Sequence, residues 1–337
     1  MMAKPLRIGT LGLGRIVQRG LLPAIDGCKH AVLAAVASQR AGVAEQFASQ
    51  RSSGGRDLPR AFESYEALLA CDEVDAVYVP CRGDAHARWT IAAAEAGKHV
   101  LCEKPLARDR AEAESMREAC SGAGVVLSEA FMYRHHPRSR RAIELVRGGA
   151  IGQPRVFAAS FSFRIDPGDW RLDPSAGGGA VWDVGCYGIN FARWVAGQEP
   201  TSVTADCLRS PSGVDLTTRV GLTFAGGMLA VIDCSFDTVY RCRAEIAGTQ
   251  GRIELPDAFL PVGEAPLYLM SGEGGDSGSD GTRVVTERFP GEDPYAHQMR
   301  HFVDSVAAGR LLEPGEDGVE NTAVCRAAVD AALSASE

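Results

Sequence analysis

The sequence predicts an α/β protein, with a doubly wound Rossmann domain over residues 1–128 and a second domain over residues 129–337. Three observations lead to this prediction. A short apolar strand runs into a glycine turn and a helix near the N-terminus, strands and helices then alternate to about residue 128, and short β-rich segments follow. Strands that alternate with helices form a parallel sheet with helices on both faces.

The composition is that of a globular protein and excludes several classes of function. The 337 residues are 45% hydrophobic and 23% charged, with a net charge of −8. This charge argues against a surface that binds nucleic acid or an anionic membrane, and no apolar run is long enough to cross a bilayer. The ten cysteines include no C-x-x-C pair, and the first residues show no apolar signal core or cleavage site, so we expect no signal sequence. We therefore expect reduced, mostly buried thiols in a cytoplasmic protein.

The first strand and the turn after it resemble a dinucleotide-binding element. Residues 6–11 form an apolar strand, and Gly12 and Gly14 follow in a G-x-G-x-x-V pattern that opens a helix. Gly12 permits a tight turn, and Gly14 lets the backbone approach a pyrophosphate at the helix N-terminus. Arg15 and Ile16, which begin the helix, are further candidate cofactor contacts.

The second strand ends without the acidic residue that usually holds the ribose of NAD. Here residues 31–37 are followed by Ser38, Gln39 and Arg40. A hydroxyl and a guanidinium suit the 2′-phosphate of NADP, because arginine forms charge-assisted, forked hydrogen bonds to phosphate. An exposed basic loop is the alternative, and the Rossmann context favours NADP(H) over NAD(H).

The alternation continues up to the domain boundary. The patterns predict helices and strands in turn over residues 62–74, 75–80, 86–98, 99–107, 109–124 and 125–133. Ligands bind at the carboxyl ends of parallel strands, so Pro80, His86 and Glu103, which fall at such ends, are candidate cofactor residues.

The stretch GGGAVWDVGCYGIN (177–190) carries the most distinctive candidates outside the Rossmann domain. A glycine run suits a place where backbone approaches a ligand closely. Asp183 and Tyr187 are four residues apart, which places both on one face of a helix. The alternative is a glycine-rich turn with a capping aspartate and a core tyrosine, and this stretch alone leaves both open.

Two motifs together resemble the glucose–fructose oxidoreductase / inositol dehydrogenase (Gfo/Idh/MocA) family. The first is Glu103-Lys104-Pro105 after a Gly-Lys-His-Val strand, and the second is the glycine stretch above. The resemblance runs from about residue 5 to the end. Tyr187, where many members carry histidine, resembles the branch of dimeric dihydrodiol dehydrogenase and NADP-dependent xylose dehydrogenase, as do residues 128–137 and 169–180.

The resemblance implies a fold for the second domain. It would hold a large, open, mainly antiparallel sheet that binds substrate and packs between subunits, giving a homodimer or homotetramer. The later sequence agrees, since β-rich segments cover residues 154–163, 201–210, 217–224, 228–236 and 241–255. A flexible hairpin loop is expected over 271–283, an amphipathic helix over 293–309 and a last helix at the end.

The resemblance also implies an activity. We expect an NADP-dependent oxidoreductase that moves a hydride between nicotinamide and a carbinol or hemiacetal carbon of a sugar or cyclic diol. Tyr187 is the acid/base candidate, because a nearby ammonium such as that of Lys104 lowers the pKa of a phenol, and the assignment between Tyr187 and Lys104 stays open. Asp183 would orient substrate hydroxyls, Glu103 and Lys104 would contact the cofactor, and the bond before Pro105 would be cis.

Further candidates each keep an alternative. Trp170 and Arg171 suit substrate binding, although the indole serves equally as a domain-interface anchor. Arg134, His135 and His136 line either the cleft or a surface loop. The loop Cys81–Ala85 departs from the family pattern, and we expect Arg82 to face solvent.

Two other functions share the same motifs. A ketoreductase acting on a nucleotide-linked keto-sugar differs only in its substrate pocket. A dinucleotide-sensing regulator would be expected to lose Lys104, Asp183 or Tyr187, all of which are present. No cluster of ligands has the spacing of a metal site, and hydride transfer to nicotinamide needs no metal.

Overall fold

The computed structural model describes residues 4–51, 58–261, 263–272, 283–313 and 318–334. The chain divides into two compact units. The first contains Met1–Met132 and Asp293–Val319, and the second contains Tyr133–Glu292 and Glu320–Glu337. Residues 293–319, which we expected in the second domain, therefore group with the first unit, and the boundary at residue 128 stays a proposal.

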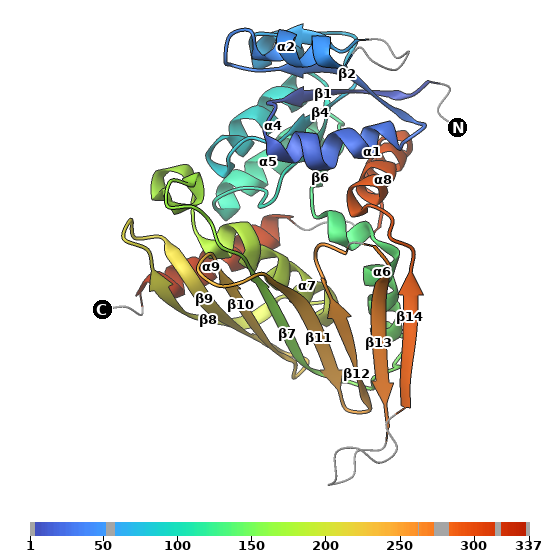
Figure 1. The fold of residues 1–337 in the computed structure, drawn as a ribbon, viewed down its shortest axis with the longest axis vertical. Helices are drawn as coiled ribbons and strands as arrows, with labels where there is room; N and C mark the ends of the chain where they lie inside the picture. The colour runs from blue at the N-terminus through green and yellow to red at the C-terminus, as the bar shows by residue number, and fades with distance from the viewer. Residues whose placement is uncertain (1–3, 52–57, 262, 273–282, 314–317, 335–337) are drawn as a thin grey trace. The chain divides into compact units, whose positions relative to one another are not determined.

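The first unit is built on a six-stranded parallel sheet (Figure 1). Its order β3-β2-β1-β4-β5-β6 reverses direction between β1 and β4. Ligands of doubly wound sheets bind at such a reversal, outside the carboxyl ends of the strands. The strands are β1 (Leu6–Leu11), β2 (Ala31–Ala37), β3 (Arg60–Phe62), β4 (Ala76–Val79), β5 (His99–Cys102) and β6 (Leu127–Glu129). The predicted Rossmann architecture is confirmed.

Side-chain caps define the starts of three helices of this unit, α3, α5 and α8. Asp109, for example, caps α5 by accepting a hydrogen bond from the Glu112 N–H at 2.9 Å. The helices are η1 (Val17–Leu21, a π-helical turn), α1 (Leu22–Asp26), α2 (Val43–Gln50), α3 (Tyr65–Leu69), η2 (Gly83–Ala85), α4 (His86–Glu95), α5 (Arg110–Gly122) and α8 (Pro294–Ala308).

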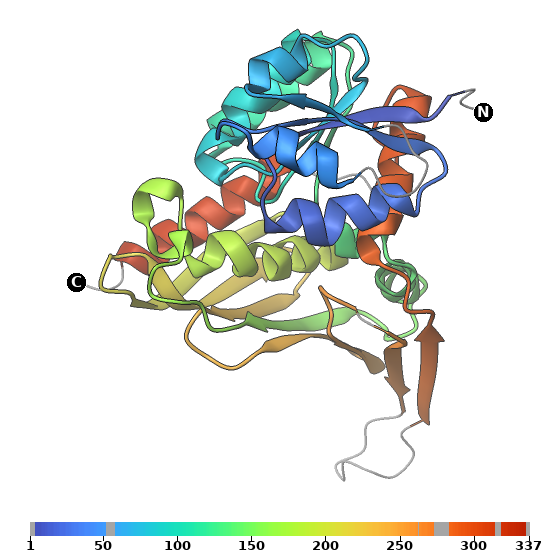
Figure 2. The ribbon, with the colours of Figure 1, turned by 45° about the horizontal axis from the view of Figure 1, so that its top comes forward.

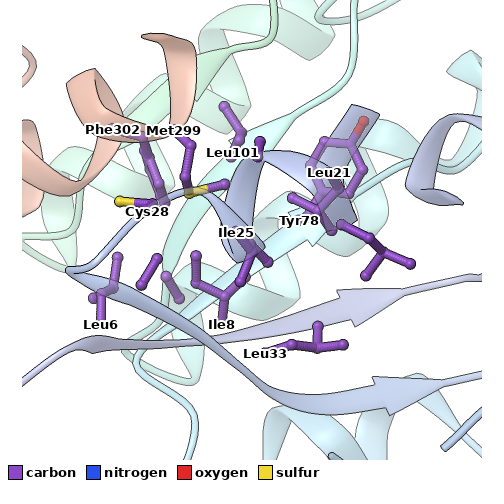
Figure 3. Close-up of a cluster of buried hydrophobic side chains, with 14 of the residues drawn as sticks. Leu6, Ile8, Leu21, Ile25, Cys28, Leu33, Tyr78, Leu101, Met299 and Phe302 are labelled. Carbon is purple, nitrogen blue, oxygen red and sulfur yellow. The ribbon is translucent and has the colours of Figure 1, made fainter. Parts of the chain in front are cut away.

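Helix α8 completes the core of the first unit although it comes from the end of the chain. Met299 and Phe302 of α8 are both 1% exposed and join the cluster that includes Ile8 and Ile25 (Figure 3). These side chains cover one face of the parallel sheet. The grouping of residues 293–319 with the first unit thus has a hydrophobic cause.

The second unit holds an eight-stranded sheet with the order β14-β13-β12-β11-β7-β10-β9-β8. All neighbours are antiparallel except β7 and β10. The strands are β7 (Pro154–Ser162), β8 (Pro200–Arg209), β9 (Asp215–Phe224), β10 (Leu229–Ser235), β11 (Arg241–Gly248), β12 (Gly251–Pro256), β13 (Ala265–Ser271) and β14 (Arg283–Phe289). The predicted open, mainly antiparallel sheet is confirmed. Most of the loop expected over 271–283 lies outside the described residues.

Helices cover one face of this sheet, as Figure 2 shows for the second unit. Inward-facing residues such as Phe157 and Ile232 are at most 1% exposed, while Leu229 and Val231 on the other face are 52% and 47% exposed. This alternation is typical of a sheet with one covered face. The helical segments are η3 (Met132–His135), α6 (Pro137–Arg147), η4 (Trp170–Leu172), η5 (Pro174–Ala176), η6 (Val181–Gly185, a π-helical turn), α7 (Cys186–Ala196) and α9 (Gly318–Ser334).

Two stretches of the sequence form other elements than we predicted. The helix expected over 62–74 is shorter, because Phe62 belongs to β3 and the Ser64 hydroxyl caps α3 by accepting from the Ala67 N–H. Helix α6 was not predicted. It begins at Pro137, a residue type suited to the first turn of a helix, and Arg134, His135 and His136 precede it.

The cysteines are mostly buried, as we expected. All ten cysteines are free thiols, and only Cys81 and Cys207 are not fully buried. Across the described ranges, no helix combines the length and apolarity needed to cross a bilayer.

Candidate active site

The glycine turn lies where the parallel sheet reverses its strand order. Gly12 has a φ of +125°, a conformation that favours glycine. A Cβ atom there would lie 3.2 Å from the Tyr65 hydroxyl, whereas a Cβ on Gly14 would meet no atom within 4 Å. The backbone at Gly14 therefore borders open space at the start of a helix. These residues fit the pyrophosphate of a dinucleotide, which binds at such a helix end.

The loop after β2 presents the two residues expected to select the nucleotide. Ser38 is 5% exposed, and its Oγ accepts a hydrogen bond from the Arg40 N–H at 3.1 Å. Arg40 is exposed. This arrangement places a hydroxyl and a guanidinium on one short turn, which fits an anionic group such as a 2′-phosphate.

The loop after β4 is tied down by His86, which lies at the start of α4. His86 is 1% exposed, with Nε2 2.9 Å from the Cys81 carbonyl oxygen and Nδ1 2.9 Å from that of Pro105. Burial lowers the pKa of His86. Both ring nitrogens thus face protein carbonyls, so His86 connects two loops instead of presenting a nitrogen to a ligand. Arg82 is exposed beside Asp84, as we expected.

The exit of β5 is held in place by buried carboxylates. The Tyr78 hydroxyl donates a hydrogen bond to Glu103, which is 9% exposed. The Lys104–Pro105 bond is cis, as the resemblance implied. Glu129 of β6 accepts from the Leu106 N–H at 2.8 Å and so fixes the next residue of the loop. Neither Tyr78 nor Glu129 was singled out from the sequence.

In the second unit, the glycine run has three separate steric causes. Gly177 has a φ of +76° and ends a short helical turn. A Cβ on Gly178 would lie 2.4 Å from the Arg171 carbonyl oxygen. Gly179 has a φ of +129°, and a Cβ there would lie 2.1 Å from Oδ1 of Asp215. The run is thus required by backbone packing inside this unit, which the sequence alone left open.

Asp215 at the start of β9 is a residue that the sequence analysis missed. It is 2% exposed, and its Oδ2 accepts from the Val181 N–H at 2.8 Å and the Thr218 hydroxyl at 3.0 Å. Burial raises the pKa of Asp215 to about 6, although these hydrogen bonds act to lower it. The carboxylate anchors the first turn of the segment that carries Asp183. In the sequence, Asp215 differs from the other aspartates only in lying 36 residues after Gly179, and such a spacing does not predict a contact.

The helix that carries Asp183 and Tyr187 begins with the wide π-helical turn η6, followed by α7. Such turns are rare and often occur at functional sites. Tyr187 is 5% exposed and packs among three aromatic rings, with centroid distances of 5.4 Å to Phe161, 5.4 Å to Phe259 and 5.9 Å to Tyr133. The tyrosine ring is therefore fixed by its surroundings.

Asp183 lies in a small charged cluster. The Arg171 Nε donates to Asp183 Oδ2 at 2.6 Å, and its Nη1 donates to Asp169 Oδ1 at 3.2 Å. Burial acts to lower the pKa of Arg171, but the two carboxylates raise it above its ordinary value. The guanidinium also lies 4.9 Å from the ring centre of Trp170, which is 36% exposed. The structure thus gathers Trp170, Arg171 and Asp183, three of the predicted substrate residues.

The residues before α6 are buried, so the surface-loop alternative for them is wrong. Arg134, His135 and His136 are 4%, 2% and 0% exposed. The Arg134 Nη1 donates to Asn190 Oδ1 at 3.0 Å, and its guanidinium lies 4.5 Å from the ring centre of Trp194. These contacts join the segment before α6 to α7, because Asn190 and Trp194 both belong to α7.

The candidates therefore form two groups, one in each unit. Gly12, Gly14, Ser38, Arg40 and Glu103 follow strands of the parallel sheet, with Arg15 exposed, Ile16 half-buried beside the turn, and Pro80 and Lys104 half-buried at strand exits. Asp183 and Tyr187 share the helix that follows the glycine run, with Arg171 attached to it.

Family models match both units. The model described as "Oxidoreductase family, NAD-binding Rossmann fold" matches residues 6–131, and the model described as "GFO/IDH/MocA C-terminal domain" matches residues 139–254.

Relatives of known activity cover nearly the whole chain. A D-xylose 1-dehydrogenase (NADP(+)) from Haloferax volcanii is 37% identical, with 98% of each chain covered. A trans-1,2-dihydrobenzene-1,2-diol dehydrogenase from Danio rerio is 35% identical over 89% of this chain and 84% of its own. Among solved structures, a 3-ketoreductase from Actinomadura kijaniata in complex with NADP and TDP-benzene is 31% identical, covers 98% of both chains and has a TM-score of 0.85.

Proposed function

The chain belongs to the Gfo/Idh/MocA oxidoreductase family, and from this we propose that it is an NADP-dependent oxidoreductase acting on a sugar or a cyclic diol. It would move a hydride between nicotinamide and a carbinol or hemiacetal carbon. The observation that carries the proposal is the segment over 177–187, where packed glycines and a buried carboxylate hold a helix that bears Asp183 and Tyr187. The xylose and dihydrodiol dehydrogenases among the relatives support this substrate class.

The cofactor assignment rests on the first unit. Gly12, Gly14, Arg15 and Ile16 would hold the pyrophosphate, because the Gly14 backbone borders open space at a helix start. Ser38 and Arg40 would bind the 2′-phosphate and so favour NADP over NAD. Pro80 and Glu103 would line the nicotinamide end, and His86 would position the loop between them.

The chain's own residues would handle the proton of the substrate hydroxyl. When bound, the nicotinamide supplies or accepts the hydride. We propose that Tyr187 takes the hydroxyl proton during oxidation and returns it during reduction, and that Lys104 provides the ammonium that lowers the phenol pKa and binds the same hydroxyl. Asp183 would accept hydrogen bonds from substrate hydroxyls, and Trp170 would lie against the apolar face of a ring.

A ketoreductase acting on a nucleotide-linked keto-sugar is the second candidate. It is favoured by the likeness to the 3-ketoreductase over 98% of the chain. The cofactor half and the proton-handling residues would be the same, and the substrate would be reduced instead of oxidised.

A substrate panel distinguishes the two candidates. The purified protein is incubated with NADP⁺ or NAD⁺ and aldoses, inositols or cyclic diols, and nicotinamide reduction is followed by absorbance. We expect turnover with an aldose or a diol and NADP⁺. Tight NADPH binding without any turnover would contradict the dehydrogenase proposal and favour the keto-sugar reductase or a dinucleotide-sensing regulator.

The acid/base role is tested by Tyr187→Phe, which removes only the hydroxyl from a packed ring. We expect kcat to fall about 100- to 10,000-fold, the usual contribution of general acid–base catalysis. The Kd of NADPH should stay within about twofold, because the change lies outside the Rossmann domain. Phe259→Leu, which alters the same aromatic cluster without an ionisable group, is the control for packing. Turnover that survives in Tyr187→Phe would contradict the assignment.

We further propose that copies of the chain associate through the uncovered face of the eight-stranded sheet, as a homodimer or homotetramer. Val156, Leu229 and Val231 form an exposed apolar centre there, with Leu229 opposite Val156 in the register. A hollow of about 410 Å³ beside it contains both acidic and basic side chains, among them Asp233, Arg243 and Glu254. A second copy offers the same mixture of charges, which suits a self-complementary interface.

A further inference from the structure

The Arg171 side chain contacts three side chains of its own unit, those of Asp169, Trp170 and Asp183. Its Nε–H donates to Asp183 at 2.6 Å, and its Nη1 donates to both oxygens of Asp169 at 3.2 and 3.4 Å. One flat face of the guanidinium lies over the Trp170 ring at 4.9 Å. A group with these partners is held by the protein on its edge and on its face, which differs from the direct substrate contact that the sequence suggested.

The backbone of Arg171 is fixed to the same segment as its side chain. Its carbonyl oxygen accepts a hydrogen bond from the Gly179 N–H at 2.9 Å, and Gly178 passes so close that a Cβ would lie 2.4 Å from that oxygen. The side chain then reaches Asp183, four residues beyond Gly179. The turn Asp169–Leu172 and the start of the helix are thus joined at two points.

Asp215 holds the opposite side of the glycine run. Its Oδ2 accepts from the Val181 N–H, and its Oδ1 lies against Gly179. The backbone between Gly179 and Val181 is therefore confined from both sides. The Arg171 Nε contact at 2.6 Å constrains the Asp183 carboxylate that this backbone carries.

We propose that Arg171 is a positioning residue that acts through Asp183, holding its carboxylate in the orientation that binds substrate. This inference rests on the proposed function, in which Asp183 accepts hydrogen bonds from substrate hydroxyls. A carboxylate already fixed by an ion pair loses less freedom when substrate binds, so the pair strengthens binding without touching the substrate. The effect of Arg171 should consequently depend on the presence of Asp183.

A double-mutant cycle tests this dependence with Arg171→Gln, Asp183→Asn and the double variant. We expect Arg171→Gln to lower kcat/KM for the sugar about 10- to 100-fold, mainly through KM, because a hydrogen bond to a charged group is lost. Arg171→Lys should recover part of the loss, since it keeps the charge but not the fork. In the Asp183→Asn background, Arg171→Gln should add less than about twofold. Arg326→Gln, which breaks an exposed ion pair with Asp330 on α9, is the control.

The outcomes separate this inference from the proposed function. Losses that simply multiply in the double variant would overturn it and indicate direct contact between Arg171 and substrate. If Arg171→Gln lowers both the affinity for NADPH and the thermal stability along with kcat/KM, its role is purely structural, and the inference is overturned as well. A wild-type protein that turns over no sugar or diol would contradict the proposed function instead.

A crystal structure of Arg171→Gln gives a readout that does not depend on turnover. We expect the Asp183 carboxylate to leave its position while Gly177–Gly179 and Val181 stay where they are, because Asp215 still holds that backbone. An unmoved Asp183 carboxylate would overturn the inference.

Discussion

Single residues at the end of β2 decide the proposed cofactor preference. In Arg40→Ala the guanidinium that would bind the 2′-phosphate is removed from an exposed position. We expect the binding free energy of NADP⁺ to weaken by about 1–2 kcal/mol, or KM for NADP⁺ to rise roughly 5- to 30-fold. The hydrogen bond from the guanidinium to the 2′-phosphate is charge-assisted but partly screened by solvent. KM for NAD⁺ should stay the same, since NAD lacks this phosphate. Steady-state kinetics with both cofactors measure the effect, with Arg110→Ala on α5 as the control, and equal KM values for NADP⁺ before and after the change would contradict the assignment.

Asp215 makes stability depend on pH in an unusual direction. Its folded-state pKa is raised from 3.8 to about 6, so between these values the folded state holds the proton more tightly than the unfolded state. The protonated Asp215 carboxyl therefore stabilises the folded state fully below about pH 4. As the pH rises to 6–7, this contribution to the free energy of unfolding falls by about 3 kcal/mol.

Urea unfolding of wild type and Asp215→Asn at pH 4, 5, 6 and 7 isolates this contribution. Other titrating groups are common to both proteins and cancel in the difference between them. We expect the wild-type free energy of unfolding, relative to that of Asp215→Asn, to decrease steadily from pH 4 to pH 7. A difference that does not change with pH would show that the carboxyl titrates at its ordinary value.

At the scale of elements, α7 approaches the sheet through a glycine. A Cβ on Gly188 would lie 2.6 Å from Ile232 Cγ2 and 3.4 Å from the Ala159 Cβ. Gly188→Ala should therefore destabilise the protein by about 1–3 kcal/mol, because overpacking a dense core outweighs the better helix propensity of alanine. Gly122→Ala at the end of α5 is the matched control, since its Cβ would meet no atom within 4 Å. There we expect stability to stay the same or to rise by up to about 1 kcal/mol. Thermal unfolding of both variants measures the contrast, and equal shifts would contradict the close approach.

The elements also show what the sequence could predict and what it could not. Strands with strong apolar patterns, such as β4 and β10, and helices with clear periodicity, such as α5, were predictable because local pattern and final burial agree. Helix α6 was missed because the residues before it, Arg134, His135 and His136, are polar and yet buried, with Arg134 bound to Asn190 of α7. Local sequence does not contain that information.

The candidate site follows the same division. Gly12, Gly14 and the pair Asp183 and Tyr187 stand in short motifs and were found from the sequence. Asp215 and Tyr78 were not, since each reaches its partner across a long separation in the chain. The two π-helical turns, at Val17–Leu21 and Val181–Gly185, likewise depend on packing that no spacing rule predicts.

At the scale of the whole molecule, the uncovered face of the eight-stranded sheet sets the expected assembly. Replacing Leu229 and Val231 together with glutamate places charges in the centre of the proposed interface, where each side chain is now about half exposed. We expect the oligomer to dissociate, as measured by light scattering after size-exclusion chromatography. Leu208→Glu, at an exposed position near the end of the edge strand β8, is the control. A wild-type monomer at micromolar concentration would contradict the proposal directly.

The contribution of α8 to the first hydrophobic cluster has a consequence for synthesis. The ribosome adds about 160 residues between Met132 and Asp293, which takes roughly 8–30 s at ordinary elongation rates. Throughout that interval the nascent nucleotide-binding fold lacks Met299 and Phe302, and the apolar surface that they cover is open to chaperones or to other chains. Most of the second unit, Tyr133–Glu292, is inserted within the first, so a fragment ending near residue 130 would emerge with an incomplete core.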